Sequence, residues 1–324
     1  CCPAEGEFRR QVEGLGLPVY PYWPRDTHRG TRWRRVRAAA GLFAATIRER
    51  PDVIHVNQAG AARVAGAVAR VTGRPTVVHV RLTGDVSYVQ TLNTTGRDSR
   101  RFIAVSDYIA SQLEEPGLSP VVRIYDPYRS NTSEVAEVAS PQSGPRFVCV
   151  GRLEQRKGQD LAIKAVSCLC EASDVPWRLQ LLGSAGEDGF EEAIEAAAAE
   201  LPDDAVEMLG FRSDVIEVLA GSAGLVCPSW DEPLGRVVFE AWDAGTIPIA
   251  WKGSGGPAEV IGESGGGLLY AEQTPESLAG AMQEVWDLEL EERRRLVGQG
   301  RRWLREHCDP NRHARQVLRQ WRKV

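Results

Sequence analysis

The sequence predicts a doubly wound α/β protein made of two Rossmann-like domains. Short, continuously apolar segments rich in β-branched residues recur along the chain, with helical stretches between them. Continuous rather than alternating apolarity is typical of parallel strands that helices cover on both faces. Regular alternation of such strands with helices predicts a doubly wound sheet. With 324 residues, the chain is long enough for two separate cores.

The expected elements follow one another from the N-terminus. Residues 1–6 are expected to end a strand that enters a helix over 7–14. The further strands are expected over 53–56, 76–80, 102–106, 147–151, 179–183, 224–229, 246–250 and 268–270. The further helices are expected over 32–48, 59–71, 107–114, 159–172, 189–201, 214–220, 236–244, 275–287, 289–306 and 311–322.

Charge divides the chain into a basic and an acidic half. Residues 1–144 hold 19 arginines, no lysine and 14 acidic residues, a balance of +5, and the remainder holds 20 basic and 30 acidic residues, a balance of −10. A segment rich in Pro, Ser and Asn interrupts the alternation of strands and helices and predicts a linker. We expect a first domain over 1–130, a linker over 131–145, a second domain over 146–305, and a C-terminal helix within 306–324 that returns toward the first domain.

Composition disfavours membrane-spanning, secreted and nucleic-acid-binding proteins. No apolar run approaches the length of a membrane-spanning helix, and no signal peptide is visible. The seven cysteines form no Cys-x-x-Cys pair and no cluster with zinc spacing, so we expect reduced thiols in a cytoplasmic protein. The net charge of −5 disfavours nucleic acid as a partner.

The segment 29–50 is basic and contains Trp33 among five arginines, while its later half is apolar. An amphipathic basic helix of this kind can lie on an anionic membrane at the inner face, or bind an anionic acceptor. The alternative is a surface helix whose Ala, Leu, Phe and Ile side chains pack on the sheet.

Two glutamates flank a turn in the segment 230-WDEPLGRVVFEAWDAGTIPIA-250. Glu232 precedes the turn, Gly235 allows a close approach to the backbone, and Glu240 lies one turn inside the following helix. The backbone N–H groups from Leu234 to Val237, Gly235 and Arg236 included, lack helical acceptors and can bind an anion or a sugar oxygen. The carboxylates can accept hydrogen bonds from vicinal hydroxyls. The alternative is that acids near a helix start only favour its dipole.

A second constellation lies in 150-VGRLEQRKGQDLAIKAV-166. The expected strand ends at Gly151, and Arg152 and Lys157 follow before the next helix. Two cations beside a helix N-terminus suit a diphosphate, although a solvated loop is the alternative. Two weaker signals are the glycine-rich turn that begins at Gly183 and the loop with Phe211 and Arg212, which could line a base pocket.

These motifs resemble the retaining nucleotide-sugar glycosyltransferases of glycosyltransferase family 4, which have the GT-B fold and an E-x7-E motif. The resemblance covers most of 145–285. It is carried by 151-GRLEQRKGQDLAI-163, 182-LGSAG-186, 209-LGFRSDV-215, 227-CPSWDEPLGRVVFEAWDAGTIPIA-250 and 254-SGGPAEVI-261. The first half is similar more loosely, through 52-DVIHV-56, 103-IAVSDYIASQL-113 and 122-VRIYDP-127. We expect the family's first N-terminal strand-turn-helix unit to be lacking.

The resemblance implies roles for the residues already singled out. Arg152 and Lys157 would hold the donor diphosphate beside Gly151 and Gly183, and Glu232 would contact the transferred sugar. Glu240 would hold the ribose, and Phe211 and Arg212 would border a base in a UDP- or GDP-linked donor. The acceptor would be a sugar, glycan or lipid-linked hydroxyl, with no metal and no other cofactor required. A front-face substitution with retention is our hypothesis for the mechanism.

The sequence departs from the family's pattern in its first half. The glycine-rich turn near the N-terminus has no counterpart in 1–144, Arg81 stands where many members have a histidine, and Asp126 replaces an asparagine. Arg81 is therefore the acceptor-side candidate, with an ordinary surface charge as the alternative. Two other functions stay open: a non-catalytic nucleotide-sugar-binding protein, and a nucleotide-sugar epimerase with the same fold.

Overall fold

The computed structural model describes residues 2–3, 7–22, 32–93, 100–113, 121–130, 137–138 and 144–324. The chain divides into two compact units. Unit 1 comprises Cys1–Tyr125 and His313–Val324, and unit 2 comprises Asp126–Arg312. The predicted linker over 131–145 and the beginning of the basic segment at 29–31 lie largely outside the described residues.

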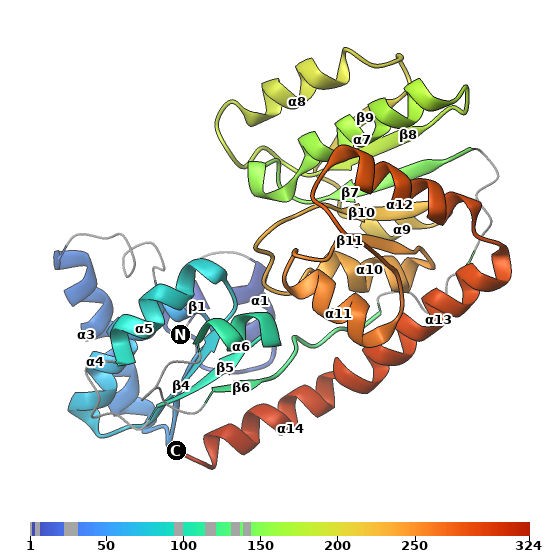
Figure 1. Ribbon diagram of the computed structural model, residues 1–324. Helices are drawn as coiled ribbons and strands as arrows, with labels where there is room; N and C mark the ends of the chain where they lie inside the picture. The colour runs from blue at the N-terminus through green and yellow to red at the C-terminus, as the bar shows by residue number, and fades with distance from the viewer. Residues whose placement is uncertain are drawn as a thin grey trace. The chain divides into compact units, whose positions relative to one another are not determined.

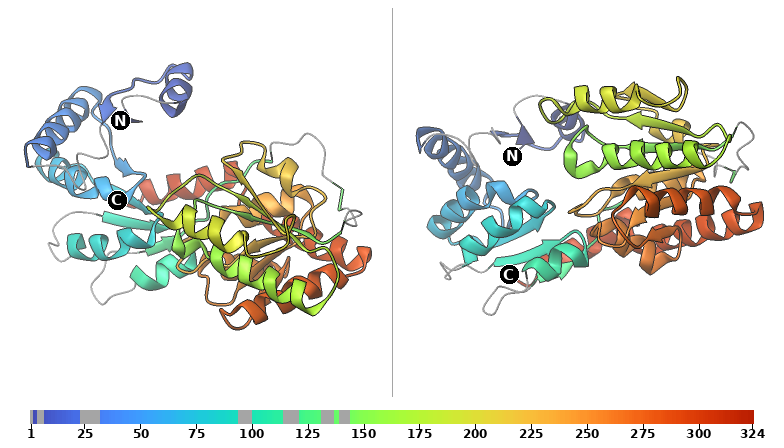
Figure 2. Two further views of the ribbon diagram at one scale, coloured as in Figure 1. Left: turned by 90° about the horizontal axis from the view of Figure 1, so that it is seen from above. Right: turned by 45° about the horizontal axis from the view of Figure 1, so that its top comes forward.

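Unit 2 contains a six-stranded parallel sheet with helices on both faces (Figures 1 and 2). Its strands are β7 (Arg146–Val150), β8 (Arg178–Leu182), β9 (Val206–Gly210), β10 (Gly224–Cys227), β11 (Pro248–Trp251) and β12 (Leu268–Tyr270). Its helices are α7 (Gln159–Ala172), α8 (Phe190–Ala198), α9 (Val215–Leu219), α10 (Arg236–Ala244), α11 (Gly256–Ser264), α12 (Pro275–Asp287) and α13 (Leu290–His307). The strands lie in the order β9-β8-β7-β10-β11-β12, the order of a dinucleotide-binding domain.

Successive residues of each buried strand supply the two sides of the unit 2 core. Phe147 and Cys149 of β7 pack with α7 and α12 on one face, whereas Val148 between them packs with α9 and α10 on the other. This alternation within a continuously apolar strand is the period of two that a strand covered on both faces requires. It confirms the interpretation of the apolar runs as doubly covered strands.

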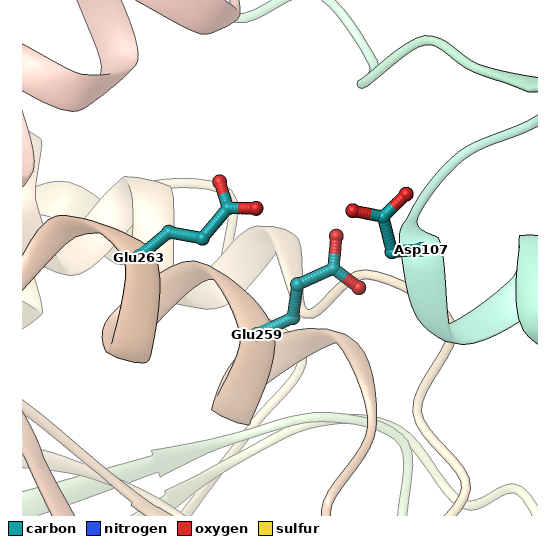
Figure 3. Close-up of side chains that lie close together, drawn as sticks. All are labelled: Asp107, Glu259 and Glu263. Atoms are coloured by element: carbon teal, nitrogen blue, oxygen red, sulfur yellow. The ribbon is translucent and has the colours of Figure 1, made fainter.

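Helices α11 and α13 of unit 2 lie against each other. Glu259 and Glu263 lie one turn apart on α11, as Figure 3 shows. The indole Nε1 of Trp303 in α13 donates a hydrogen bond of 3.1 Å to Glu263 Oε2. Helix α11 was not predicted from the sequence, because its Gly-Gly-Pro start is more typical of a turn.

Unit 1 contains a parallel sheet in the order β3-β4-β5-β6 and a separate pair, β1-β2. The strands are β1 (Cys2–Pro3), β2 (Pro21–Tyr22), β3 (Ile54–Val56), β4 (Thr76–Val80), β5 (Arg100–Ala104) and β6 (Val121–Arg123). The helices are α1 (Glu7–Gly14), α3 (Arg32–Glu49), α4 (Ala62–Thr72), α5 (Val86–Asn93) and α6 (Asp107–Leu113). The last helix, α14 (Pro310–Trp321), packs Val317 against Val77 and Ile103 of this sheet.

Two further expectations concerned reduced cysteines and membrane-spanning helices. Cys149, Cys168, Cys170, Cys227 and Cys308 are free thiols. None of the helices in the described part of the chain is both long and apolar enough to cross a membrane.

Candidate functional site

The strand order of unit 2 reverses between its two central strands. β8 and β9 continue the sheet on one side of β7, while β10, β11 and β12 lie on the other. Ligands of doubly wound sheets bind in the crevice at the carboxyl ends of strands where such a reversal occurs. The loop after β7 carries Arg152 and Lys157, and the loop after β10 carries Glu232. The charged residues singled out from the sequence therefore follow the two strands that form the reversal.

Lys157 and Glu232 form a direct ion pair at this reversal. Lys157 Nζ lies 2.5 Å from Glu232 Oε2, and their side chains are only 14% and 15% exposed. Arg156 Nη1 approaches the same oxygen at 3.5 Å. Because both partners are largely shielded from water, the ion pair holds the lysine ammonium in one place better than a surface pair would.

Glu154 extends this pair into a chain of alternating charges. Its Oε1 lies 2.7 Å from Arg152 Nη1, and its Oε2 lies 2.9 Å from Arg156 Nε. Three cations thus share two carboxylates, which leaves one positive charge in excess within the chain. An arrangement of several oriented cations with an excess charge suits an incoming dianionic or trianionic group.

The backbone of Glu232 is held on both sides. Its N–H donates to the Ser254 carbonyl at 3.0 Å, and its carbonyl accepts from the Gly256 N–H at 2.8 Å. The preceding Asp231 has a φ of 56°, in the left-handed region that non-glycine residues rarely adopt. The turn that places the Glu232 carboxylate is therefore determined by the 254–256 loop as well as by its own sequence.

Helix α7 follows the β7 loop and α10 follows the β10 loop, and both begin without a side-chain cap. Gly158 and Gly235 occupy the cap positions, with φ of 71° and 73°. A glycine cap leaves the first-turn N–H groups without a side-chain acceptor, so they can bind an external oxygen. In α10 these N–H groups include those of Arg236 and Val237.

Two glycines let the loops at this edge of the sheet approach neighbouring segments closely. A Cβ on Gly183, which follows β8, would collide with the carbonyl oxygen of Gly151, which follows β7. A Cβ on Gly235 would collide with the Pro257 side chain. Gly151, Gly183 and Gly235 therefore shape the loops at this edge, whatever ligand they meet.

Glu240 lies on the second turn of α10 and is mostly buried. Burial raises the pKa of its carboxyl group, and Arg236 partly opposes that rise. One turn further along α10, Asp243 Oδ2 accepts a 3.0 Å hydrogen bond from the Tyr128 hydroxyl. A desolvated carboxylate in this position gains most from hydrogen-bond donors supplied by a ligand.

The remaining residues predicted for the site differ in how exposed their side chains are. The side chain of Leu234 is buried, so only its backbone is available, whereas Phe211 is 78% exposed after β9. Arg212 is paired with Asp214, with its Nε 2.8 Å from Oδ1. Arg81 belongs to unit 1, where its Nη2 lies 3.1 Å from Asn57 Oδ1.

Sequence reasoning missed Glu154, Arg156 and Gln159. Gln159 is 1% exposed, and its Nε2 donates to the Arg152 carbonyl at 2.9 Å, which fixes the loop that carries the cations. A signal was present, because Arg152, Glu154, Arg156 and Lys157 place charges of both signs within six residues. Their pairing depends on the loop conformation, which the spacing alone does not give.

Comparison with known families identifies both halves of the chain. Residues 130–303 match the model described as glycosyl transferases group 1, and residues 1–125 match the glycosyl transferase 4-like domain. The glycogen synthase of Pseudomonas paraeruginosa is 34% identical over 157 residues, which are 48% of this chain and 30% of that protein. The glycogen synthase of Thermus thermophilus is 29% identical over 205 residues, which are 60% and 45% of the two chains. The matched segments thus span less than half of these relatives.

Solved structures share the fold over nearly the whole chain. Anabaena Alr3699/HepE, solved in complex with UDP and glucose, superposes with a TM-score of 0.79 at 19% identity, over 99% of this chain and 90% of that one. A glycosyltransferase from Rickettsia africae superposes with a TM-score of 0.81 at 16% identity, over 98% and 88% of the chains. The fold is GT-B, with two Rossmann-like domains, which confirms the predicted fold class.

Proposed function

The chain belongs to the glycosyl transferases group 1 family, and we propose that it transfers a hexose from a nucleotide-diphosphate sugar to an acceptor hydroxyl. The observation that carries this proposal is the ion pair between Lys157 and Glu232 at the strand reversal, with Arg152 and Arg156 beside it. A diphosphate and a sugar are joined in the donor, and this arrangement offers cations and a carboxylate side by side.

The cations would hold the donor diphosphate and stabilise the charge that develops as it leaves. Lys157 is a mobile point charge, while Arg152 and Arg156 can each engage two oxygens. The open N-termini of α7 and α10 add backbone N–H donors. Oriented groups of this kind stabilise a leaving group without reorganising during the reaction. They support a metal-independent mechanism as part of the proposal.

The carboxylates would hold the two sugars of the donor. When a phosphate takes Lys157 as its partner, Glu232 becomes available to accept hydrogen bonds from hydroxyls of the transferred sugar. Glu240, desolvated on α10, would accept hydrogen bonds from the ribose. We further propose retention by front-face substitution, in which the leaving diphosphate accepts the proton of the acceptor hydroxyl. Trapping a glycosyl adduct on Glu232 by mass spectrometry would contradict this mechanism.

The donor would be UDP- or GDP-linked, with the base near Phe211 and Arg212. Anabaena Alr3699/HepE was solved with UDP-glucose, which supports a UDP-linked hexose. The matched relatives named glycogen synthase support a sugar or glycan as acceptor, in polysaccharide biosynthesis. A lipid-linked acceptor, in glycolipid biosynthesis, is the other acceptor within the proposal. The free thiols support a reducing cytoplasm.

One surface of α3 supports contact with an anionic membrane. Trp33, Val36, Phe43 and Ile47 are exposed at spacings that place them on one face of the helix, and Trp33 is 83% exposed. The alternative, in which the Ala, Leu, Phe and Ile side chains of this helix pack on the sheet, does not hold for Phe43 and Ile47, which are 39% and 54% exposed. An exposed apolar stripe on an arginine-rich helix fits the interface of an anionic bilayer.

The test of the proposed function is release of nucleoside diphosphate from UDP- and GDP-linked hexoses, with and without short glycan acceptors. We expect release with one nucleotide and faster release when an acceptor is present. Tight binding of a donor without release would favour the non-catalytic alternative. Absence of both binding and release would contradict the proposal.

A further inference from the structure

Unit 1 contains a pocket of about 330 Å³ that the proposed transferase reaction does not use. It lies between the strands β3 and β4 on one side and α14 on the other. The strands and the residues that follow them contribute His55, Asn57 and His79, and α14 contributes His313 and Trp321 to its lining. The volume is at the lower end of the range of about 300–1,000 Å³ for small-molecule sites.

His79 lines this pocket and carries a buried hydrogen-bond donor. The residue is 1% exposed, and Arg81 Nη2 lies 3.4 Å from its Nδ1. An arginine side chain can only donate, so Nδ1 accepts and the ring hydrogen resides on Nε2. Nε2 is buried and has no hydrogen-bond partner. A buried donor without a partner is costly, and a ligand oxygen would remove that cost.

His55 carries its hydrogen in the same way. Trp321 Nε1 donates to His55 Nδ1 at 2.8 Å, which again leaves the hydrogen on Nε2. Neither ring therefore offers a free Nε2 lone pair to a metal ion, and the guanidinium of Arg81 beside His79 disfavours a second cation. The pocket is suited to accept an oxygen that bears negative charge.

The lowered pKa values of His55 and His79 agree with a pocket that disfavours positive charge. Burial, followed by the charge of Arg81, lowers the pKa of His79 to about 2 and that of His55 to about 4. The other groups that act on His79 are His55 and His313. His313 Nδ1 lies 2.8 Å from the Tyr125 carbonyl and therefore donates to it. The positive charge of Arg81, which disfavours cationic imidazole, favours a bound anion.

The rest of the lining is apolar and comes from α14. Ala314, Val317 and Leu318 line the pocket beside the indole of Trp321. We propose that this pocket binds a small carboxylate, whose oxygen accepts the Nε2 hydrogen of His79 while its apolar body lies against Val317, Leu318 and Trp321. The bound molecule joins the strands to α14 and thereby stabilises the attachment of the helix to unit 1.

Benzoate is a suitable probe because it combines a carboxylate with a flat apolar body, and calorimetry measures its binding to the full chain. We expect His79→Leu to weaken benzoate binding by at least about tenfold, because a hydrogen bond to a charged oxygen is lost. His79→Gln keeps a donor near the same place and should remain within about threefold of the wild type. His307→Gln, which changes a histidine of unit 2, is the matched control and should bind as the wild type does.

A second variant tests the pocket without changing its histidines. Ala314→Phe fills the space and should abolish benzoate binding, and a thermal melt of each variant establishes that it folds. Benzamide, which has the same shape without the charge, should bind more weakly than benzoate. The proposal would be overturned if benzoate bound Ala314→Phe as well as it binds the wild type, or if it did not bind the wild type at all. Binding of inorganic phosphate in place of benzoate would overturn it as well.

Discussion

The two units carry parallel sheets of the same kind but differ in strand order. Unit 2 reverses its order between β7 and β10, whereas the strands described in the main sheet of unit 1 follow one another as β3-β4-β5-β6. A crevice at the strand ends arises where the order reverses. Unit 2 therefore places charged loop residues at the strand ends where the order reverses, while the pocket of unit 1 lies between its sheet and α14.

The two sites also differ in the charge state of their ionisable side chains. In unit 2, Lys157 and Glu232 neutralise each other directly, with the excess charge spread along the loop. In unit 1, His55 and His79 are kept neutral by burial.

The largest effect is expected from the lysine at the strand reversal. Lys157→Ala should lower the rate of donor cleavage by about 10²–10³-fold, because one oriented charge on the leaving group is lost. Lys164→Ala is the matched control, since Lys164 is a surface residue of α7 in a loose pair with Asp160 at 3.8 Å. Steady-state release of nucleoside diphosphate measures both. Equal rates for the two variants would remove Lys157 from the reaction.

Acid should destabilise unit 1 before unit 2. His55 has a pKa of 6.5 when unfolded and about 4 when folded, so the unfolded state binds more protons between these values. Stability from this group is complete above pH 6.5 and decreases as the pH falls to 4, by at most about 3 kcal/mol. Glu240 acts in the opposite direction, because its raised pKa adds stability as the pH falls. Hydrogen exchange of both units between pH 7 and pH 4 measures this difference, and greater acid loss in unit 2 would contradict it.

A smaller effect is expected from the close approach of the strand ends in unit 2. Gly183→Ala should destabilise the protein by about 1–3 kcal/mol, because its Cβ meets the Gly151 carbonyl. Gly280→Ala, on a helix with no atom within 4 Å of the added Cβ, should instead be neutral or stabilise by up to about 1 kcal/mol. Urea unfolding of the two variants gives the comparison. Similar stabilities would mean that the loops after β7 and β8 can separate without cost.

The smallest effect on stability is expected at the exposed face of α3. Ile47→Glu should change the free energy of unfolding by no more than about 0.5 kcal/mol, yet weaken binding to vesicles that contain phosphatidylserine by about tenfold. Val71→Glu, at a still more exposed apolar residue of α4 (75% against 54% for Ile47), is the control. Cosedimentation with the vesicles distinguishes the two. Unchanged binding of Ile47→Glu would exclude the α3 stripe as the contact.

Helices whose first and last residues are marked by capping residues could be predicted from the sequence. Helices α10 and α12 have the predicted bounds, because glycines flank the first and the Thr274-Pro275 pair starts the second. Strand β9 was missed because it lies at the edge of the sheet, where Glu207 is exposed and the apolar run is broken. Helix α5 was missed as well, since its eight residues carry no strong start signal.

The candidate site was predicted only in part, for a related reason. Motif spacing placed Arg152, Lys157 and Glu232 at strand ends. It could not show that Lys157 pairs with a carboxylate 75 positions away, or that Glu154 joins Arg152 to Arg156. Such contacts depend on the loop conformations and on the strand order, which places β10 beside β7.

Hydrogen exchange of the full chain in the presence of UDP, GDP or ADP can show whether a nucleotide-sugar donor binds at the strand reversal of unit 2. We expect one nucleotide to protect the backbone amides of residues 151–158 and 234–240. The same nucleotide should leave the β3, β4 and α14 amides around the unit 1 pocket unchanged. Protection confined to unit 1, or no protection by any of the three nucleotides, would mean that the donor does not bind at the strand reversal.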